Sequence, residues 1–361
     1  MINEALLKNE ELAVYKLRSL YSKYGYTQYK MSKFEEYDLY VRNKDFLISD
    51  RVITFTDTNG KLLALKPDVT LSIINHLGNA EIQKLYYNEN VYRVSGESHR
   101  FKEIMQTGLE CVGNIGLYEI SEVTSLAVQS LMMIDDNYQL DISHAGFVEA
   151  ILNENDISED ILKDVREYIS LKNEGGINKL FKDGLLNEKQ AKALYALIKN
   201  YSDISEMNIE LSSNEAKASF GEFKAVLDSL KALELHKNVN INFSLANNMS
   251  YYNGIVFKGY IKGIPTGVLS GGQYDSLMKK LKKNASAIGF AVYMDSFERL
   301  NTKPNEYDVD ILLIVKDEKP EIILKKVEQL SRNGETVLAR KSIPEKIKYK
   351  KLIEIDGKES F

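Results

Sequence analysis

The sequence contains little cysteine, proline or tryptophan and has no surplus of positive charge. Of its 361 residues, one is cysteine (Cys111), five are proline and none is tryptophan. A single cysteine cannot form an internal disulfide, so nothing indicates an oxidising compartment. The scarcity of proline excludes a Pro-rich disordered chain. With 47 Lys+Arg against 52 Asp+Glu, the formal net charge is −5, whereas a protein that coats nucleic acid needs surplus cations.

Membrane, metal and common cofactor signals are also missing. No apolar run approaches the roughly 18 residues of a membrane-spanning helix, and the N-terminus lacks the features of a signal peptide. We therefore expect a cytoplasmic protein that does not associate with membranes. No P-loop, GxGxxG, HExxH or CxxC motif occurs, and the histidines lack metal-ligand spacing, so no metal or cofactor is expected. The four histidines are His76, His99, His144 and His236.

Helix and strand patterns predict an α+β fold with two domains. Strand patterns predominate before residue 113. Over about 144–237 the sequence shows 3.6-residue periodicity, which predicts a helical insertion into this β-rich pattern. A strand is expected again over 240–245. The polar segment around Pro304 predicts the boundary between a domain over 1–300 and a small αβ domain over 306–361. Within the small domain we expect strand 308–315, helix 320–333, strand 336–340, a short helix and strand 351–355.

The strand predicted over 103–112 carries the clearest sign of a binding site. Alternation places an apolar set, read as core, on one face and Gln106, Gly108 and Glu110 on the other. An amide and a carboxylate that flank a glycine would let a ligand approach the backbone closely. The alternative is an ordinary polar face turned to solvent. The apolar set comprises Met105, Thr107, Leu109 and Cys111.

Other polar residues strengthen the interpretation as a site. Arg93 could pair with a ligand carboxylate in bidentate fashion, and Asp68 could receive an ammonium group. Tyr251 and Tyr252 could form a stacking wall, although paired tyrosines in a strand more often belong to the core and its rim. Together these groups would suit an amino acid with a polar side chain.

Several short motifs occur in the order found in histidyl-tRNA synthetase catalytic cores, which are class II folds built on an antiparallel sheet flanked by helices. The motifs are LKPDVT (65–70), VYR (91–93), EIMQTGLECVG (103–113), YYNGIVF (251–257), GGQYDSL (271–277) and IGFAV (288–292). The chain resembles this family over residues 10–300, and 306–361 is weakly similar to a shortened anticodon-binding-type domain. The resemblance implies a histidine site formed by Asp68, Thr70, Arg93, Gln106, Glu110, Tyr251 and Tyr252, with Asp68 in place of a common glutamate.

The chain departs from the family where the synthetases bind and activate ATP. Asn247 stands at the position of an activating arginine, and Ser296 at that of the arginine that grips ATP. Adenylate formation places negative charge on phosphate oxygens, which fixed cations stabilise. Losing two cations should lower the rate by orders of magnitude, so we expect neither catalysis nor ATP use. The other departures are Ser95 for glutamate, Gln273 for arginine and Tyr293 for glycine, with Arg299 one turn beyond Ser296.

A kept histidine site beside a lost ATP site is similar to the ATP phosphoribosyltransferase regulatory subunits of this family, as is DISHAGFVEAIL (141–152). The resemblance implies a non-catalytic subunit in the first step of histidine biosynthesis, required by a short-form ATP phosphoribosyltransferase catalytic subunit and mediating feedback by L-histidine. Two alternatives stay open: a divergent histidyl-tRNA synthetase, and a stand-alone synthetase-like paralogue with another partner.

Two further expectations follow from the resemblance. A helix over 3–24 and the segment after it align loosely with a dimerisation motif, which implies a homodimeric core within a hetero-oligomer, although the proline of that motif is absent. The basic run from Arg340 to Lys351 is expected to be a solvated face rather than an RNA-binding remnant, because it lacks aromatics for base stacking apart from Tyr349. No nucleic-acid partner is expected.

Overall fold

The fold is described from a computed structural model over residues 7–43, 52–76, 82–94, 100–248, 252–299 and 306–355, apart from the side chains of 247, 248, 298 and 299. The chain divides into two compact units, Met1–Leu300 and Asn301–Phe361. None of the helices in the described ranges is long and apolar enough to span a membrane.

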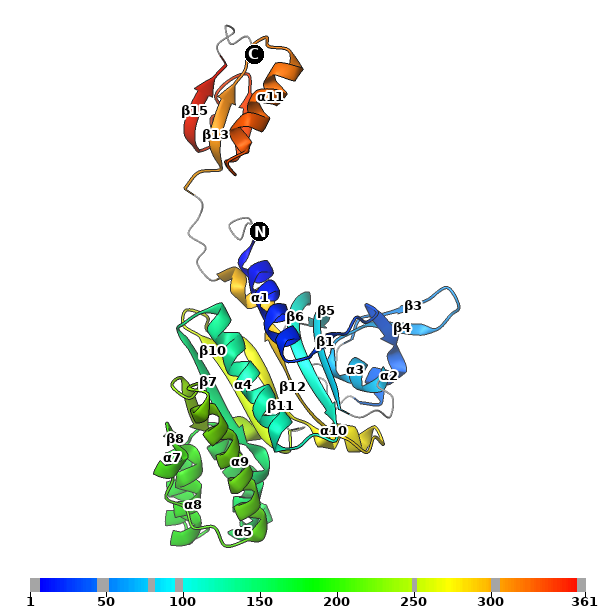
Figure 1. Ribbon diagram of the computed structural model, residues 1–361. Helices are drawn as coiled ribbons and strands as arrows, with labels where there is room; N and C mark the ends of the chain where they lie inside the picture. Colours follow the sequence, from blue (N-terminus) through cyan, green and yellow to red (C-terminus); the bar gives the residue numbers. More distant parts are fainter. Residues whose placement is uncertain are drawn as a thin grey trace. The chain divides into compact units, whose positions relative to one another are not determined.

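A nine-stranded sheet organises the first unit, in the order β1-β5-β6-β12-β11-β10-β7-β9-β8 (Figure 1). Neighbouring strands are antiparallel except for the pairs β1–β5 and β7–β9. This antiparallel sheet flanked by helices confirms the predicted α+β class. The strands are β1 (Thr27–Gln28), β5 (Gln83–Val94), β6 (Phe101–Gly113), β7 (Tyr138–His144), β8 (Asn200–Tyr201), β9 (Val239–Asn242), β10 (Ile255–Ile261), β11 (Leu269–Gln273) and β12 (Ser286–Tyr293).

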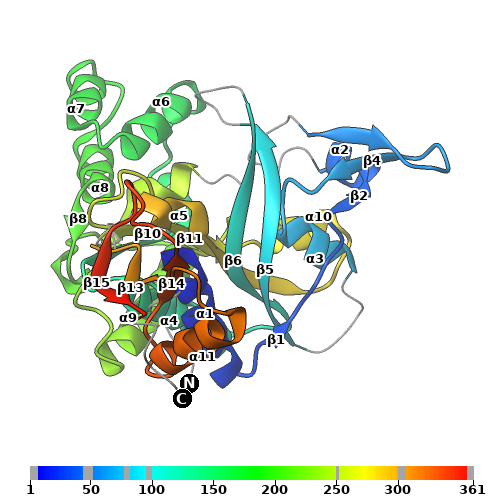
Figure 2. The ribbon, with the colours of Figure 1, turned by 90° about the horizontal axis from the view of Figure 1, so that it is seen from above.

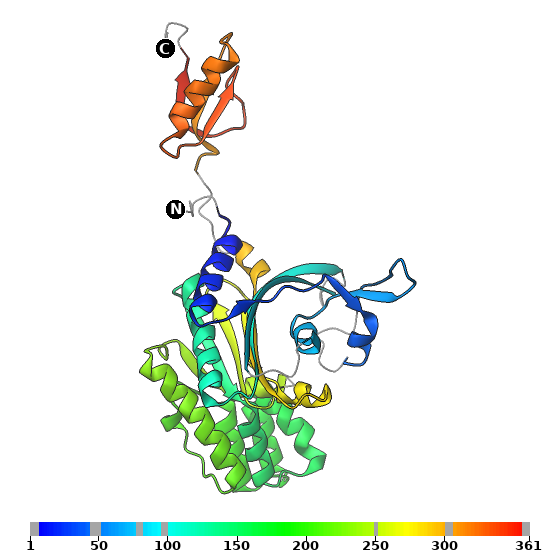
Figure 3. The ribbon, with the colours of Figure 1, turned by 45° about the vertical axis from the view of Figure 1, so that its right-hand side comes forward.

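One face of this sheet packs against helices α1 (Asn9–Lys23) and α4 (Leu117–Ile134), which Figure 3 shows side by side along it. Leu17 and Tyr21 lie one helical turn apart on α1, and both are fully buried. They meet the apolar side of the sheet, where Leu109 of β6 is also fully buried. Each large apolar side chain buried here stabilises the fold by roughly 1.5–3 kcal/mol, so this face forms the core and cannot hold a polar site.

Helices fill most of the chain between β7 and β9. They are α5 (Ala145–Glu154), α6 (Glu159–Ser170), α7 (Glu174–Lys182), α8 (Glu188–Ile198), the 3-10 turn η3 (Ile204–Glu206) and α9 (Asn214–Ala232). The strand expected over 240–245 is shorter than predicted, because β9 ends at Asn242 and the 3-10 helix η4 (Phe243–Asn248) follows. The Asn242 Oδ1 atom accepts hydrogen bonds from the backbone N–H and hydroxyl of Ser244, a local pairing that competes with strand formation.

A small sheet and short helices lie beside β5 and β6 (Figure 2). The sheet has the order β2-β4-β3, and β3 and β4 form a hairpin whose turn contains Asn59-Gly60, with Gly60 at a φ of 80°. The elements are β2 (Phe34–Glu36), α2 (Tyr37–Val41), β3 (Thr54–Thr56), β4 (Leu62–Leu65), α3 (Thr70–His76) and α10 (Asp275–Lys280). They cover the second face of the large sheet at its β5–β6 end, whereas the 3-10 helix η5 (Met294–Arg299) packs in the core with α1.

The second unit is a three-stranded parallel sheet with one helix. Its strands have the order β14-β13-β15. The short helix expected before the last strand is wrong: the described residues 341–348 contain no helix. Pro344 lacks a backbone donor and disfavours helical backbone in the residue before it. The elements are β13 (Val309–Ile314), α11 (Pro320–Ser331), β14 (Val337–Arg340) and β15 (Tyr349–Glu354).

The crowding over Gly108 gives a test of this packing. A Cβ atom at Gly108 would lie 2.2 Å from the backbone oxygen of Phe290 on the neighbouring strand, and backbone cannot move aside cheaply. We expect Gly108→Ala to lower the free energy of unfolding by roughly 1–3 kcal/mol, as measured by urea denaturation. Gly221→Ala is the control, because Gly221 lies in α9 and no described atom outside its own stretch of helix comes within 4 Å of its added Cβ. This variant should stabilise the protein by up to about 1 kcal/mol. Equal stability of the two variants would contradict this account.

Candidate functional site

The second face of the large sheet is polar and buried around β6. Gln106, Gly108 and Glu110 share this face, as the alternation predicts, and the side chains of Gln106 and Glu110 are only 2% and 1% exposed. The alternative of a polar face turned to solvent is therefore wrong. Since a buried carboxylate or amide costs free energy unless it is paired, the surroundings of Glu110 decide what this face can do.

Glu110 is held between two hydroxyl groups from different parts of the chain. Thr70, in the first turn of α3, places Oγ1 2.6 Å from Glu110 Oε1, and the Tyr274 hydroxyl is hydrogen-bonded to Glu110 Oε2. The carboxyl group lies over Gly289 of β12, where an added Cβ would fall 1.8 Å from Oε2. Only glycine at 289 leaves room for this carboxyl group.

Burial raises the pKa of Glu110 to about 8. The hydrogen bonds with Thr70 and Tyr274 act in the opposite direction, and the negative charge of Asp68 raises the pKa further. At pH 7 the carboxyl group is therefore mostly protonated. Hydroxyl groups can accept as well as donate, so one of the two neighbours can take the carboxyl proton in its hydrogen bond. Glu110 is thus a protonated acid that can pass its proton to an incoming base.

Arg93 and Asp68 form the second charged pair of the site. Arg93 is 8% exposed, its Nε donates to the Pro67 carbonyl at 2.6 Å, and its guanidinium lies 3.5 Å from the Asp68 carboxylate. Asp68 Oδ1 also accepts from the backbone N–H of Leu71 at 2.8 Å, which caps α3 and fixes the position of Thr70. The pair presents one cation and one anion, the two charges that the main-chain groups of a free amino acid require.

The remaining predicted residues fall in the same part of the sheet with one exception. The ring of Tyr252 packs against Gly272 of β11, which pairs with Gly289 beneath Glu110. Tyr251 lies outside the described residues. The structure therefore brings together Asp68, Thr70, Arg93 and Glu110. Tyr252 lies one strand further along the sheet, and Gln106 shares the face of β6 with Glu110.

Sequence reasoning assigned no role to several residues that shape this face. Tyr274 follows the two glycines of GGQYDSL, and no spacing rule pairs it with Glu110. Tyr87 is 1% exposed and points its hydroxyl at the space above Gly108. Lys66 is 1% exposed and donates to Glu89 at 2.5 Å, a buried ion pair on the strand that carries Arg93. Lys66 belongs to the LKPDVT motif, but no spacing in the sequence indicates that it is buried and paired with Glu89.

The structure describes some of the residues at which the chain departs from the family pattern. Tyr293 pairs with Gln106 across the β12–β6 ladder, and its hydroxyl is 2.7 Å from Ser270 Oγ, so a phenol ring occupies the site face. Gln273 donates to Asp275 at 3.1 Å. Ser296 is half-buried in η5, whereas Ser95 and the side chains of Asn247 and Arg299 lie outside what the structure describes.

Comparison with known proteins identifies the family. The histidyl-tRNA synthetase family model matches residues 2–297. The chain belongs to the histidyl-tRNA synthetase family. It is 28% identical over 320 residues, 84% of this chain and 75% of the relative, to the ATP phosphoribosyltransferase regulatory subunit of Clostridium botulinum (strain Langeland). It is 26% identical over 312 residues, 82% of this chain and 74% of the relative, to that of Bacillus cereus (strain ZK).

Solved structures of this family share the fold. A Bacillus halodurans ATP phosphoribosyltransferase regulatory subunit/histidyl-tRNA synthetase has a TM-score of 0.78 at 23% identity, covering 96% of this chain and 93% of that one. A chain of the Thermotoga maritima ATP phosphoribosyl transferase (HisG:HisZ) complex has a TM-score of 0.63 at 20% identity, covering 79% and 97%. The histidyl-tRNA synthetase of Nostoc sp. has a TM-score of 0.69 at 18% identity, covering 93% and 83%. These likenesses confirm the class II fold.

The raised pKa of Glu110 predicts how stability depends on pH. An acid whose folded pKa lies above its unfolded value favours folding less as pH rises from 4.5 to about 8. Glu110→Gln removes this cost and keeps the shape of the side chain. The stability of Glu110→Gln relative to the parent protein should therefore increase between pH 5 and 8.5, by up to a few kcal/mol.

Chemical denaturation at the two pH values measures this difference. The control is Glu159→Gln, at an exposed position in the first turn of α6, which should follow the parent protein at both pH values. A difference between Glu110→Gln and the parent that stays constant with pH would show that the Glu110 carboxyl is not held protonated by burial.

Proposed function

We propose that this protein is the regulatory subunit of an ATP phosphoribosyltransferase, required by a short-form catalytic subunit in the first step of histidine biosynthesis. It carries no catalysis of its own and transmits feedback from L-histidine. The two relatives named above support this role, and so does the buried polar face around Glu110. We further propose that the core is homodimeric within a cytoplasmic hetero-oligomer.

The observation that carries the histidine proposal is the buried Glu110 carboxyl with its proton available. Histidine offers an imidazole that can accept this proton and then form an imidazolium–carboxylate pair with Glu110. Thr70 and Tyr274 keep the carboxyl group in place, while Asp68 faces the ligand ammonium and Arg93 faces its carboxylate. A ligand without a basic side chain would leave Glu110 without this partner, and a buried unpaired group is the source of strong discrimination. Gln106 and the Tyr252 ring complete the proposed site.

Adenylate formation is the weaker alternative. A synthetase must stabilise phosphate charge with fixed cations, and Asn247 and Ser296 provide none. The Tyr293 ring further narrows the face beside Gln106. A divergent synthetase would show pyrophosphate exchange that depends on histidine and ATP, and we expect none. A stand-alone paralogue would leave the activity of the phosphoribosyltransferase unchanged.

Feedback requires that histidine binds one state of the assembly better than another. A differential affinity of about 1–3 kcal/mol, or roughly 5- to 150-fold, is typical of such coupling. The protein supplies the histidine site and the catalytic partner supplies the chemistry, so the coupling must pass through their contact.

Reconstitution tests the proposal. The short-form catalytic subunit should be weakly active alone, gain activity when this chain is added, and become inhibited by L-histidine only in the complex. Glu110→Gln should retain activation and raise the histidine concentration for half-inhibition by about 10- to 100-fold, since a hydrogen bond to a charged group is worth about 1.5–3 kcal/mol. Glu159→Gln is the matched control and should leave inhibition unchanged. A catalytic subunit that is fully active and histidine-sensitive alone would overturn the proposal.

The proton held by Glu110 predicts a pH optimum for histidine binding. Free imidazole has a pKa of about 6.5, and Glu110 has a raised pKa of about 8. Between these two pH values free imidazole is neutral and Glu110 is protonated. Together they carry the single proton that the imidazolium–carboxylate pair needs. Below this window a proton must be lost on binding, and above it one must be gained. The affinity should therefore be greatest near pH 7 and fall by about tenfold per pH unit on either side.

Calorimetric titration with L-histidine between pH 5.5 and 9 measures this profile. Glu110→Gln should bind more weakly and lose the decline that begins near pH 8. The α-ammonium of histidine titrates in both proteins, so the difference between the two profiles isolates Glu110. If the parent protein and the variant decline in parallel on the alkaline side, Glu110 is not the group that exchanges the proton.

A further inference from the structure

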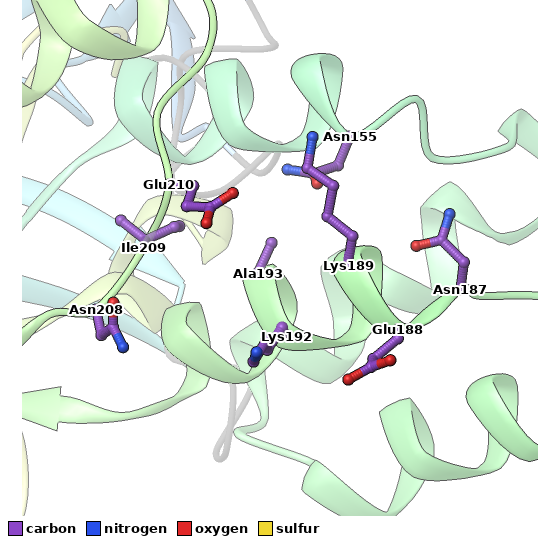
Figure 4. Close-up of a pocket in the computed structure, with 9 residues that line it drawn as sticks. All are labelled: Asn155, Asn187, Glu188, Lys189, Lys192, Ala193, Asn208, Ile209 and Glu210. Atoms are coloured by element: carbon purple, nitrogen blue, oxygen red, sulfur yellow. The ribbon is translucent and has the colours of Figure 1, made fainter.

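A second hollow lies in the helical part of the first unit, at the opposite end of the large sheet from α3. Its volume is about 550 Å³, within the range of roughly 300–1,000 Å³ that small-molecule sites occupy. Three segments line it: the residue after α5, the N-terminal half of α8, and residues 208–210 before α9 (Figure 4). None of the lining residues belongs to the site on β6.

A buried acceptor faces this hollow. Asn155 is 8% exposed, and its Nδ2 donates to the Ile151 carbonyl at 2.9 Å, which fixes the orientation of the amide. Its Oδ1 is buried and has no hydrogen-bond partner among the residues that the structure describes. In Figure 4 the Asn155 amide points toward the space enclosed by the labelled side chains. An unsatisfied buried acceptor costs about 1–3 kcal/mol, so the position favours a ligand that brings a donor.

The walls of the hollow are held in place before any ligand arrives. Gln190 donates from Nε2 to the Asn155 carbonyl at 2.9 Å, and its backbone N–H donates to Asn187 Oδ1 at 2.9 Å. The first bond joins the start of α8 to the end of α5, and the second caps α8. On the third wall, Glu154 Oε2 accepts from the backbone N–H of Ser213 at 2.8 Å. Such pre-ordering lowers the entropy that binding would cost.

The charges around the hollow are balanced. Lys189 and Lys192 project from α8, and neither makes an ion pair with any residue that the structure describes. The carboxylates of Glu188 and Glu210 provide two negative charges on the same lining. The two carboxylates would repel a polyanion such as a phosphate, and the two lysines would repel a simple cation. The lining suits a small molecule that carries one charge of each sign.

We propose that this hollow binds a free α-amino acid as its zwitterion. The ammonium donates to Asn155 Oδ1 and faces the Glu210 carboxylate, while the carboxylate faces Lys189 and Lys192 near the positive end of the α8 dipole. The proposal is independent of the proposed histidine site, because the two share no lining residue and each can be altered by its own variants.

Ligand-observed saturation-transfer NMR on the full chain tests the proposal, with each of the twenty common amino acids added separately and the hits measured by calorimetry. At least one amino acid should bind with a Kd below about 1 mM and keep its affinity in Glu110→Gln. Its N-acetyl derivative, which lacks the ammonium, and its methyl ester, which lacks the carboxylate, should each bind at least tenfold more weakly. Absence of any binding that survives Glu110→Gln would overturn the proposal.

Matched lysine variants locate the site. The double variant Lys189→Gln/Lys192→Gln should weaken binding at least tenfold without changing stability, because both side chains are exposed and unpaired among the described residues. Lys217→Gln, at an exposed position on α9 outside the lining, should bind as the parent protein does. Equal affinity in the double variant and the control would place the amino acid elsewhere and refute the proposal.

Discussion

The arrangement of this protein's polar face depends on one constraint, which is the burial of the Glu110 carboxyl in the middle of a sheet. A carboxyl group at 1% exposure must be neutral or well paired. The sheet meets this requirement with two hydroxyl groups and with glycine beneath the side chain, at Gly289. On the proposed function, a basic ligand would pair with Glu110 and offset the cost of burying this carboxyl.

The same constraint explains the neighbouring elements. Thr70 reaches Glu110 because Asp68 caps α3 at its first turn, and Asp68 is in turn held next to Arg93. On the proposed function, the absence of cations at Asn247 and Ser296 leaves this polar face in place, because its contacts join Asp68, Thr70, Arg93 and Glu110 to one another.

Much of the sheet and part of the site could be predicted from the sequence alone. Alternation along β6 separates Leu109 from Gln106 and Glu110, because side chains in a strand point to opposite faces. It cannot tell that both faces are buried, since the cover over Glu110 comes from Tyr274, 164 positions away along the chain. The turn after β9 could not be predicted, because it depends on the Asn242 side chain accepting a hydrogen bond from the backbone N–H of Ser244. Whether Asn155 Oδ1 is buried without a described partner depends on how α8 packs against the end of α5, and no local sequence pattern predicts that packing.

The central claim, that Glu110 stores a proton for its ligand, has one direct measurement. Carbon-13 NMR of protein labelled at the glutamate carboxyl carbons, with the Glu110 signal assigned by its loss in Glu110→Gln, reports the ionisation of this group. The account predicts a titration midpoint near pH 8 in the free protein and an ionised carboxyl at pH 7 once L-histidine is bound. A Glu110 signal that is already ionised at pH 7 without ligand would contradict it.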